Sequence, residues 1–364
     1  MKHYYTSESV TVGHPDKTCD TIADSILDYA LSVDPNSKMA VEATIKDELI
    51  LIYGECNTTA DIPFEKIAKD TMKEIGFKDE YTVMVKVGKQ SSEINQAVVK
   101  ETEVGAGDQG IMYGFACDET DSYMPLTIDL AHRLAKQLQD VFRNDPNTIL
   151  MPDGKTQVTV EYEDGVVKRI DTVVVSTQHV ASASLKDVQE YVMKNVIEPI
   201  CKNELVDENT KYIINPSGSF IVGGSFGDSG TTGRKIVVDT YGGHGRIGGG
   251  CFSSKDPSKV DRSAAYYSRY VAKNIVAHGL AKKCEIQVSY AIGIARPLSI
   301  FIDTYGTNTV SEAEIRKYVD DNFDFSVANI INELDLRRPI YKQTASYGHF
   351  GRCDLDLPWE RIKD

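Results

Sequence analysis

The sequence predicts an α+β protein built from three similar units. The order helix, β-hairpin, helix, strand recurs along the chain, and each unit spans roughly 100 to 130 residues. The total of 364 residues exceeds one typical domain and is long enough for more than one core. Direct identity between the thirds is slight, so the prediction rests on these matching patterns.

The first unit begins near His14, where Pro15 suits a first helical turn because its missing N–H would be unpaired there. Gly76 is a typical residue to end the second helix. Apolar residues recur at helical spacing in both helices and alternate in the strands. The predicted elements are a helix from 14 to 30, strands at 41–45 and 49–53, a helix over 64–75 and a strand at 81–87.

The second and third units repeat the pattern. Ser184 is placed to cap a helix, and Ser311 with Glu314 forms a capping box, in which each side chain pairs with the other residue's backbone N–H. The elements predicted for the second unit are a helix over 126–141, a hairpin of 157–162 with 166–175, a helix over 184–196 and a strand at 211–214. Those predicted for the third are a helix over 264–275, strands at 285–292 and 299–304, and a helix from 311 to 319.

Composition points to an ordinary globular protein of the cytoplasm. Hydrophobic residues make up 41% of the chain, and no apolar run approaches the roughly 20 residues of a membrane span. The N-terminus lacks a signal-peptide core. Seven scattered cysteines indicate reduced thiols, with neither a disulfide framework nor a zinc site. A net charge of −14 argues against nonspecific binding to nucleic acid or anionic membranes.

The stretch 242–262 is the strongest functional signal. Six of its first nine residues are glycine, which lets the backbone come close to a ligand and aim N–H groups at its oxygens. Lys255, Lys259, Asp261 and Arg262 follow, a set that suits a polyphosphate with its metal ion. Residues 228–262 carry six basic and four acidic side chains, a local +2 in an acidic chain. The alternative is a surface loop that leads into a helix.

Three shorter patterns match known motifs without their expected setting. Residues 105–110 fit the dinucleotide fingerprint but follow a polar stretch and lead into an apparent strand. Residues 223–227 fit a nucleophile elbow, with no helical pattern after them, and 227–230 echo a serine-protease site. Residues 154–156 resemble the end of a P-loop that lacks its first glycine. We therefore set aside a dehydrogenase, a serine hydrolase and a P-loop enzyme.

Gly13-His14-Pro15-Asp16-Lys17 places an imidazole, a carboxylate and an ammonium at a helix N-terminus, a position that itself favours phosphate. A lone histidine there is more often a cap. Together with GAGDQG at 105–110 and GGGCFSSKDPSKVDRSAAY at 248–266, this segment closely resembles the S-adenosylmethionine synthetase family. The resemblance covers nearly the whole chain.

The resemblance implies three similar intertwined domains related by pseudo-threefold symmetry, each a sheet with helices on one face. Their predicted ranges are 1–98, 110–224 and 226–364. It also implies the reaction of ATP, L-methionine and water to S-adenosylmethionine, phosphate and diphosphate, with Mg²⁺, two per site, and K⁺. The family's active site lies between two subunits, so we expect a homo-oligomer, a dimer of dimers.

The resemblance also assigns roles to individual residues. The catalytic cations that it implies around the triphosphate are His14, Lys155, Arg234, Lys235 and Lys255. The further ATP contacts are Lys17, Asp153, Ser219, Phe220, Asp228 and Cys251. The methionine contacts are Glu55, Gln90, Asp108, Asp228 and Lys259. The metal ligands are Asp16 and Asp261 for Mg²⁺ and Glu42 for K⁺.

The chain departs from the family pattern at three of these positions or next to them. Ser219 stands where arginine is usual, which weakens the expected nucleotide contact, and Cys251 and Ser254 replace a common alanine and glycine. The polar segment 90–104 corresponds to a mobile loop of the family, so we expect a lid that closes over both substrates. Its polarity alone would favour a solvated connector.

Two other functions remain open at this stage. A different ATP-using transferase would keep the same charged cluster without methionine-dependent release of triphosphate. A non-catalytic, nucleotide-binding relative would bind ATP without turnover. Apart from the arginine expected at 219, every charged position that the resemblance implies is present, which argues against the second alternative.

Overall fold

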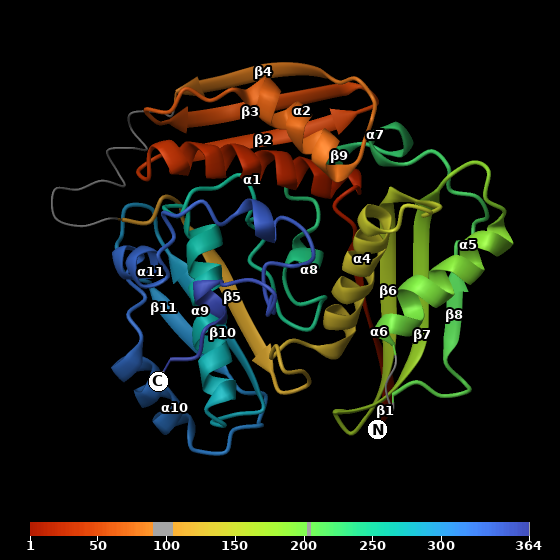
Figure 1. The fold of residues 1–364 in the computed structure, drawn as a ribbon. Coiled ribbons are helices and arrows are strands. Elements are labelled where there is room, and N and C mark those ends of the chain that lie inside the picture. The colour runs from red at the N-terminus through yellow and green to blue at the C-terminus, as the bar shows by residue number, and fades with distance from the viewer. Residues whose placement is uncertain (90–104, 202–204, 364) are drawn as a thin grey trace.

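A computed structural model describes residues 1–89, 105–201 and 205–363. Within these residues the strands form three sheets (Figure 1). The predicted lid 90–104, and with it Gln90, lies outside the described residues.

The first sheet has the strand order β4-β3-β2-β9. β2 (Lys38–Lys46) and β3 (Leu49–Asn57) form the predicted antiparallel hairpin, and β4 (Thr82–Lys89) runs parallel to β3. β9 (Gly230–Thr231) pairs with the other edge of β2, although it belongs to the last third of the chain.

The second sheet has the order β1-β6-β7-β8. β6 (Leu150–Glu163) and β7 (Val166–His179) form the second predicted hairpin, and β8 (Lys211–Ile214) runs parallel to β7. β1 (Lys2–Val10), which the sequence did not predict, pairs antiparallel with β6 along its whole length. Residues 154–156 therefore lie inside a strand, which rules out a P-loop.

The third sheet has β10 (Lys283–Tyr290) between β11 (Ser299–Asp303) and β5 (Gly110–Cys117), all antiparallel. β5 begins at the last glycine of the GAGDQG segment. Because that segment opens a strand and not a helix, it is no dinucleotide-binding fingerprint.

The three sheets exchange strands in a cycle. β1 leaves the first third for the second sheet, β5 leaves the central third for the third sheet, and β9 leaves the last third for the first sheet. This arrangement confirms an α+β fold of three similar, intertwined units. The boundaries 1–98, 110–224 and 226–364 stay a prediction.

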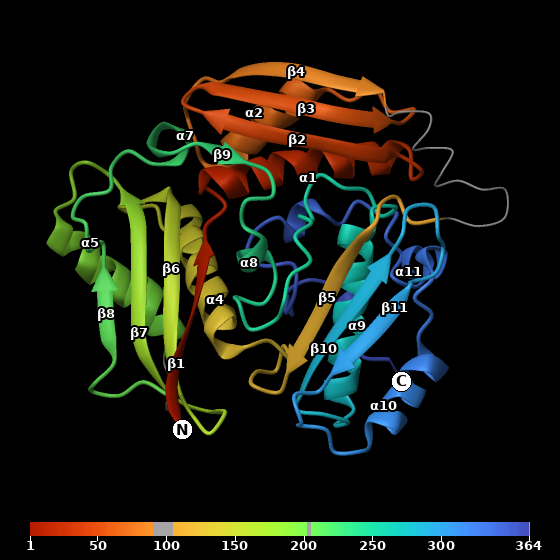
Figure 2. The ribbon, with the colours of Figure 1, turned by 180° about the vertical axis from the view of Figure 1, so that it is seen from behind.

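Four long helices cover one face of the sheets. α1 (Pro15–Val33) and α2 (Phe64–Ile75) pack on the first sheet, α4 (Leu126–Asn144) on the second and α9 (Val260–Ala277) on the third. Figure 1 shows the helix side, and Figure 2 shows the opposite side, where the sheets are uncovered. The shorter helices are α5 (Leu185–Val192), the π-helix η1 (Met193–Ile197), α6 (Glu198–Ile200), α7 (Gly224–Gly227), α8 (Ile236–Asp239), α10 (Glu312–Asn322), α11 (Val327–Glu333), η2 (Lys342–Thr344) and η3 (Pro358–Glu360).

The predicted helix ends are confirmed. Gly76 ends α2 in the left-handed region with φ of 117°. Capping boxes open α5 at Ser184, with Asp187, and α10 at Ser311, with Glu314. Buried apolar side chains form two clusters, one between α4 and the second sheet and a larger one that joins the first and third sheets through α1 and α9. The N-terminus of α1 lies where these parts meet.

Candidate active site

The site begins at the N-terminus of α1. His14 is the N-cap residue, and its Nδ1 accepts a hydrogen bond from the backbone N–H of Asp16 at 3.2 Å. Burial lowers the pKa of His14 to about 4, and the positive charge of Lys235 acts in the same direction. The ring is therefore neutral near pH 7. Because Nδ1 is the acceptor, the proton sits on Nε2, which can donate to an anion.

Asp16 gathers the cations of the last third of the chain around this terminus. Its carboxylate accepts from the backbone N–H of Thr231 at 3.0 Å and lies 2.5 Å from Lys235 Nζ and 3.6 Å from Arg234 Nε. Burial alone would raise the pKa of Asp16, but the bonds from Lys235 and Thr231 lower it overall. The carboxylate is thus ionised, and two cations stand beside a helix N-terminus that also favours negative charge.

Lys155 and Asp153 flank His14 from β6. Lys155 is exposed, and its Nζ lies 3.9 Å from the carboxylate of Glu8 on β1. Its positive charge also lowers the pKa of His14. Asp153 is buried and accepts from the backbone N–H of Gly224 at 2.8 Å, and burial raises its pKa to about 6. Asp228 is exposed, and its negative charge raises the pKa of His14, against the larger effect of burial.

A second charged group follows the glycine-rich stretch. Lys255 Nζ lies 2.7 Å from the carboxylate of Asp261, which is in the first turn of α9. A Cβ added at Gly250 would lie 2.3 Å from Cγ of Asp261. Glycine at 250 is therefore needed for this carboxylate to take its place, which explains one glycine of the signature.

The two groups are neighbours. Gly233, directly before Arg234, has φ of 81°, and a Cβ there would lie 2.7 Å from both Cβ and Sγ of Cys251. Cys251 stands four residues before Lys255 in the same loop. The turn that carries Arg234 and Lys235 therefore packs against the loop that carries Lys255.

Glu42 and Glu55 lie on the uncovered face of the first sheet. Both are partly exposed, whereas the neighbouring residues on β2, Val41 and Ala43, face the core. Tyr53 donates its hydroxyl to Glu42 at 3.2 Å, and Glu42 acts electrostatically on Lys255. Glu42, predicted for K⁺, and Glu55, predicted for methionine, thus lie on β2 and β3, and Figure 2 shows these strands from the same side as β6, which carries Lys155.

Two predicted lysines have their charge balanced inside the chain. Lys17 is buried, with its ammonium 2.9 Å from Asp20 and bonded to Asp239, and its pKa is raised by these two carboxylates against the effect of burial. Lys259 lies 2.5 Å from the buried Asp256. Their predicted contacts with triphosphate and methionine stay predictions, although both ammonium groups are held in internal ion pairs.

The remaining predicted residues have few contacts. Asp108 is exposed and bonds the N–H of Gln109, and Ser219 is exposed as well. Phe220 is half-buried, and its backbone N–H donates to His179 Nε2 at 3.0 Å. Ser225, the serine of the apparent nucleophile elbow, is buried and donates to the carbonyl of Asp47, so its hydroxyl is engaged in the fold.

Sequence reasoning missed the carboxylates that hold these loops. Asp20 and Asp24 on α1 bond the segments that carry Arg234, Lys235 and Lys255. Their signal was available in the sequence, because they stand four and eight residues after Asp16 and so share its helix face.

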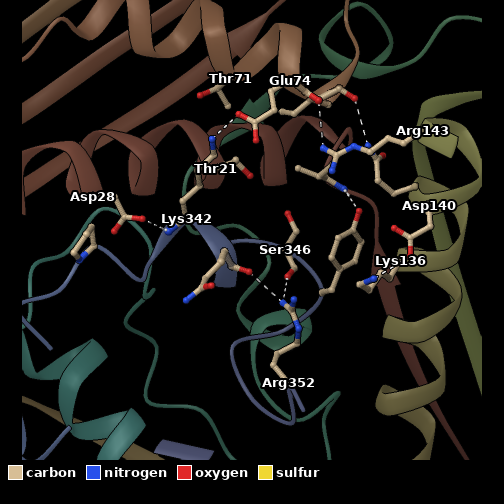
Figure 3. Close-up of a pocket in the computed structure, with 16 residues that line it drawn as sticks. Thr21, Asp28, Thr71, Glu74, Lys136, Asp140, Arg143, Lys342, Ser346 and Arg352 are labelled. Carbon is tan, nitrogen blue, oxygen red and sulfur yellow. Dashed lines mark hydrogen bonds and ion pairs between the residues drawn. The ribbon is translucent and has the colours of Figure 1, made fainter. Parts of the chain in front are cut away.

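A cavity of about 480 Å³ lies apart from this site, where α1, α2, α4 and the segment after Pro339 meet (Figure 3). None of the predicted site residues that the structure describes lines it. Its charged side chains are largely paired with one another, Lys342 with Glu74 at 2.5 Å and Lys136 with Asp140 at 2.9 Å.

Among the described residues, no group of three or more His, Cys, Asp or Glu side chains could by itself hold a metal ion. Mg²⁺ in phosphate-transfer sites is commonly bound by one or two carboxylates, with substrate phosphates and water completing the shell. Asp16 and Asp261 fit that pattern. No described helix is long and apolar enough to cross a membrane.

A triplicated α+β fold that gathers cations and single carboxylates at a helix N-terminus defines a protein that handles phosphate groups. Comparison with known protein families identifies the family to which the chain belongs. The N-terminal, central and C-terminal domain models of S-adenosylmethionine synthetase match residues 2–100, 103–220 and 222–361. The chain belongs to the S-adenosylmethionine synthetase family, which uses metal ions, has methionine adenosyltransferase activity and makes S-adenosylmethionine from ATP and methionine.

Proposed function

We propose that the chain makes S-adenosylmethionine by direct attack of the methionine sulfur on ribose C5′ of ATP, followed by hydrolysis of the triphosphate to phosphate and diphosphate. The observation that carries this mechanism is the meeting of Arg234 and Lys235 with His14 at the N-terminus of α1. The sulfur has no proton to lose, so its attack needs no general base. What the reaction needs is stabilisation of the leaving triphosphate.

Each cationic residue has a part in that stabilisation. His14, neutral and with its proton on Nε2, donates to the phosphate oxygen next to the breaking bond. Arg234, Lys235, Lys155 and Lys255 surround the negative charge that develops on the other oxygens. Because Asp16 already holds the Lys235 ammonium and the N–H of Thr231, these groups require little rearrangement as charge develops.

For the substrates, we propose that Asp153, Phe220, Cys251 and the backbone at Ser219 contact the nucleoside. Glu55, Asp108 and Asp228, with Lys259, bind methionine, whose ammonium suits a carboxylate and whose carboxylate suits a lysine.

Asp16 and Asp261 would hold Mg²⁺, two ions per site, and Glu42 would hold K⁺. Bound Mg²⁺ neutralises charge on the phosphates and orients them. Within the chain, Asp16 and Asp261 also fix the cations next to them, at 2.5 Å for Lys235 and 2.7 Å for Lys255. Each carboxylate therefore organises one charged group, with or without a metal.

We further propose that the uncovered sheet faces form an interface with a second copy of the chain, in a dimer or a dimer of dimers. The faces carry large apolar side chains that are about half exposed, among them Met84 at 55% and Phe301 at 56%. β2, which carries Glu42, and β6, which carries Lys155, belong to sheets that are both seen from their uncovered side in Figure 2. A partner seated there would complete the site.

The test incubates the protein with ATP, methionine, Mg²⁺ and K⁺ and measures S-adenosylmethionine by mass spectrometry, with phosphate and diphosphate in parallel. Lys235→Met should lose turnover. Lys66→Met is the matched control, because among the described residues Lys66 forms an ion pair with Asp70 alone, on the surface of α2. Triphosphate released without methionine would indicate a different ATP-using enzyme, and ATP binding without any product would indicate a non-catalytic relative.

A further inference from the structure

One face of α1 carries a row of four aspartates, each four residues after the last: Asp16, Asp20, Asp24 and Asp28. Residues at this spacing lie one above another on a helix, where like charges repel. All four are buried or nearly so. Each accepts backbone N–H groups from the last third of the chain. The donors are Thr231 for Asp16, Gly233 for Asp20, Ser254 for Asp24, and Tyr341 and Lys342 for Asp28.

Asp20 holds the turn that precedes Arg234. Its Oδ1 accepts from the backbone N–H of Gly233 at 2.8 Å, and Gly233 has φ of 81°. The other carboxylate oxygen bonds the ammonium of Lys17 at 2.9 Å. The fully buried carboxylate of Asp20 thus holds the backbone at Gly233, and the position of Gly233 determines where the side chains of Arg234 and Lys235 point.

Asp24 does the same for Lys255. It accepts from the backbone N–H of Ser254 at 3.0 Å and from the hydroxyl of Ser253 at 3.0 Å. Ser254 also has φ of 81°, a left-handed conformation that is unfavourable for a serine. Arg262 binds both oxygens of Asp24 at 2.8 and 2.7 Å, so this carboxylate has little freedom to move.

The two arrangements match. In each, a buried aspartate of α1 bonds the N–H of a residue with positive φ, and the next residue in the chain is a cation of the site. We propose that Asp20 and Asp24 are positioning residues. Because both stand on α1, they fix the loop that carries Arg234 and Lys235 and the loop that carries Lys255 at a constant distance from each other. The inference rests on the proposed function of Arg234, Lys235 and Lys255.

Asp28 provides a matched control within the same row. It bonds the N–H groups of Tyr341 at 3.0 Å and Lys342 at 2.9 Å and lines the cavity of Figure 3, on the side where the figure shows it beside Lys342. Neither donor has a positive φ, and neither is a proposed site residue. Asp28 therefore shares with Asp20 and Asp24 the helix, the helix face and the type of hydrogen bond, but it does not hold a loop that carries a cation of the proposed site.

The experiment compares Asp20→Glu, Asp24→Glu and Asp28→Glu. Glutamate keeps the negative charge that Lys17 and Arg262 require but moves the carboxylate by one methylene, roughly 1.5 Å. Because a displacement of about 1 Å in a catalytic group can lower the rate about 10²-fold, kcat should fall at least 10-fold in the first two variants. KM for ATP should change less. Asp28→Glu should lose a similar amount of thermal stability and keep kcat within about twofold of the wild type.

If glutamate does not fit at one of the three positions, asparagine variants of Asp20, Asp24 and Asp28 provide the same comparison of kcat and thermal stability. Adding Ser254→Gly to an Asp24 variant should restore part of kcat, since glycine adopts positive φ without help. Equal kcat in the folded Asp20, Asp24 and Asp28 variants, or no folded variant at 20 or 24 while those at 28 fold, would overturn the proposal in favour of a purely structural role. If the wild type forms no S-adenosylmethionine, the proposed function fails instead.

Discussion

Asp28 should make the protein less stable as pH rises. Burial raises the pKa of its carboxyl from 3.8 to about 7, although two backbone N–H groups oppose the shift. Between these values the folded chain binds a proton that the unfolded chain releases. The free energy of unfolding therefore decreases with rising pH across this window. A shift of about 3 units corresponds to about 4 kcal/mol, of which about 2 to 3 kcal/mol falls between pH 5 and pH 8.

The perturbation is Asp28→Asn, which cannot titrate. The amide keeps one acceptor oxygen for Tyr341 or Lys342 and turns an N–H toward the other, a mismatch that contributes a pH-independent cost of roughly 1 to 3 kcal/mol, to which the pH-dependent change of the wild type is added. The measurable quantity is the difference between wild type and variant. At pH 5 the wild type should be the more stable protein, and by pH 8 this advantage should shrink or reverse.

The assay is urea unfolding followed by circular dichroism at pH 5, 6, 7 and 8, at one fixed protein concentration because oligomers unfold in a concentration-dependent way. Other titrating groups, such as the buried Asp239, change both proteins alike and cancel in the difference. A difference that stays the same from pH 5 to pH 8 would refute the reasoning, since Asp28 would then titrate alike in the folded and unfolded chain.

Three further predictions concern the site and the assembly. Lys235→Met should lower kcat about 10²-fold with little change in KM for methionine, as expected for a group that acts on charge in the transition state; an effect on KM alone would assign it to ground-state ATP binding. Gly250→Ala should abolish most turnover, because its Cβ would overlap Asp261, whereas Gly249→Ala, with open space around the added Cβ, should cost only backbone strain from its φ of 92°. Equal initial rates in the two alanine variants would contradict this reading of Gly250. Light scattering should give an active species heavier than one chain of 40.3 kDa, and an active monomer would refute the shared interface.

Most helices and hairpins were predictable because their apolar residues follow one clear period. β1 was not, because two of the three side chains that it buries, Ser7 and Ser9, are polar, and only Val10 is apolar. Ser7 bonds Thr127 and the carbonyl of Gly242, and Ser9 bonds His132. A strand whose inner face is serine shows no alternation of apolar and polar residues. β9 was missed because it has only two residues, too few for any pattern.

The sequence indicated which charged residues the proposed site contains, but not which of them form ion pairs with one another. Residue type and motif named His14, Asp16 and Lys235, and the structure brings these together. The same reasoning gave Lys17 a phosphate contact, which stays a prediction, but it did not show that the ammonium bonds Asp239, more than two hundred residues away. A sequence shows which groups are charged but not which distant carboxylate pairs with each of them. A lysine that is available to a ligand therefore cannot be distinguished, from the sequence, from a lysine that forms an internal ion pair.

The exchange of strands brings together the parts of the chain that carry the proposed site residues. β9 pairs with Thr44 and Ile45 of β2, and this pairing carries the last third of the chain across the N-terminus of α1. Arg234 and Lys235 follow within four residues, so they reach Asp16 without any long loop of their own. β1, paired with β6, holds Val10 opposite Lys155 just before the chain turns into α1. β1 and β9 thus each end beside residues of the proposed site. A chain cut into its three thirds would lose both connections, and the intertwined topology is therefore a condition for the charged groups to meet.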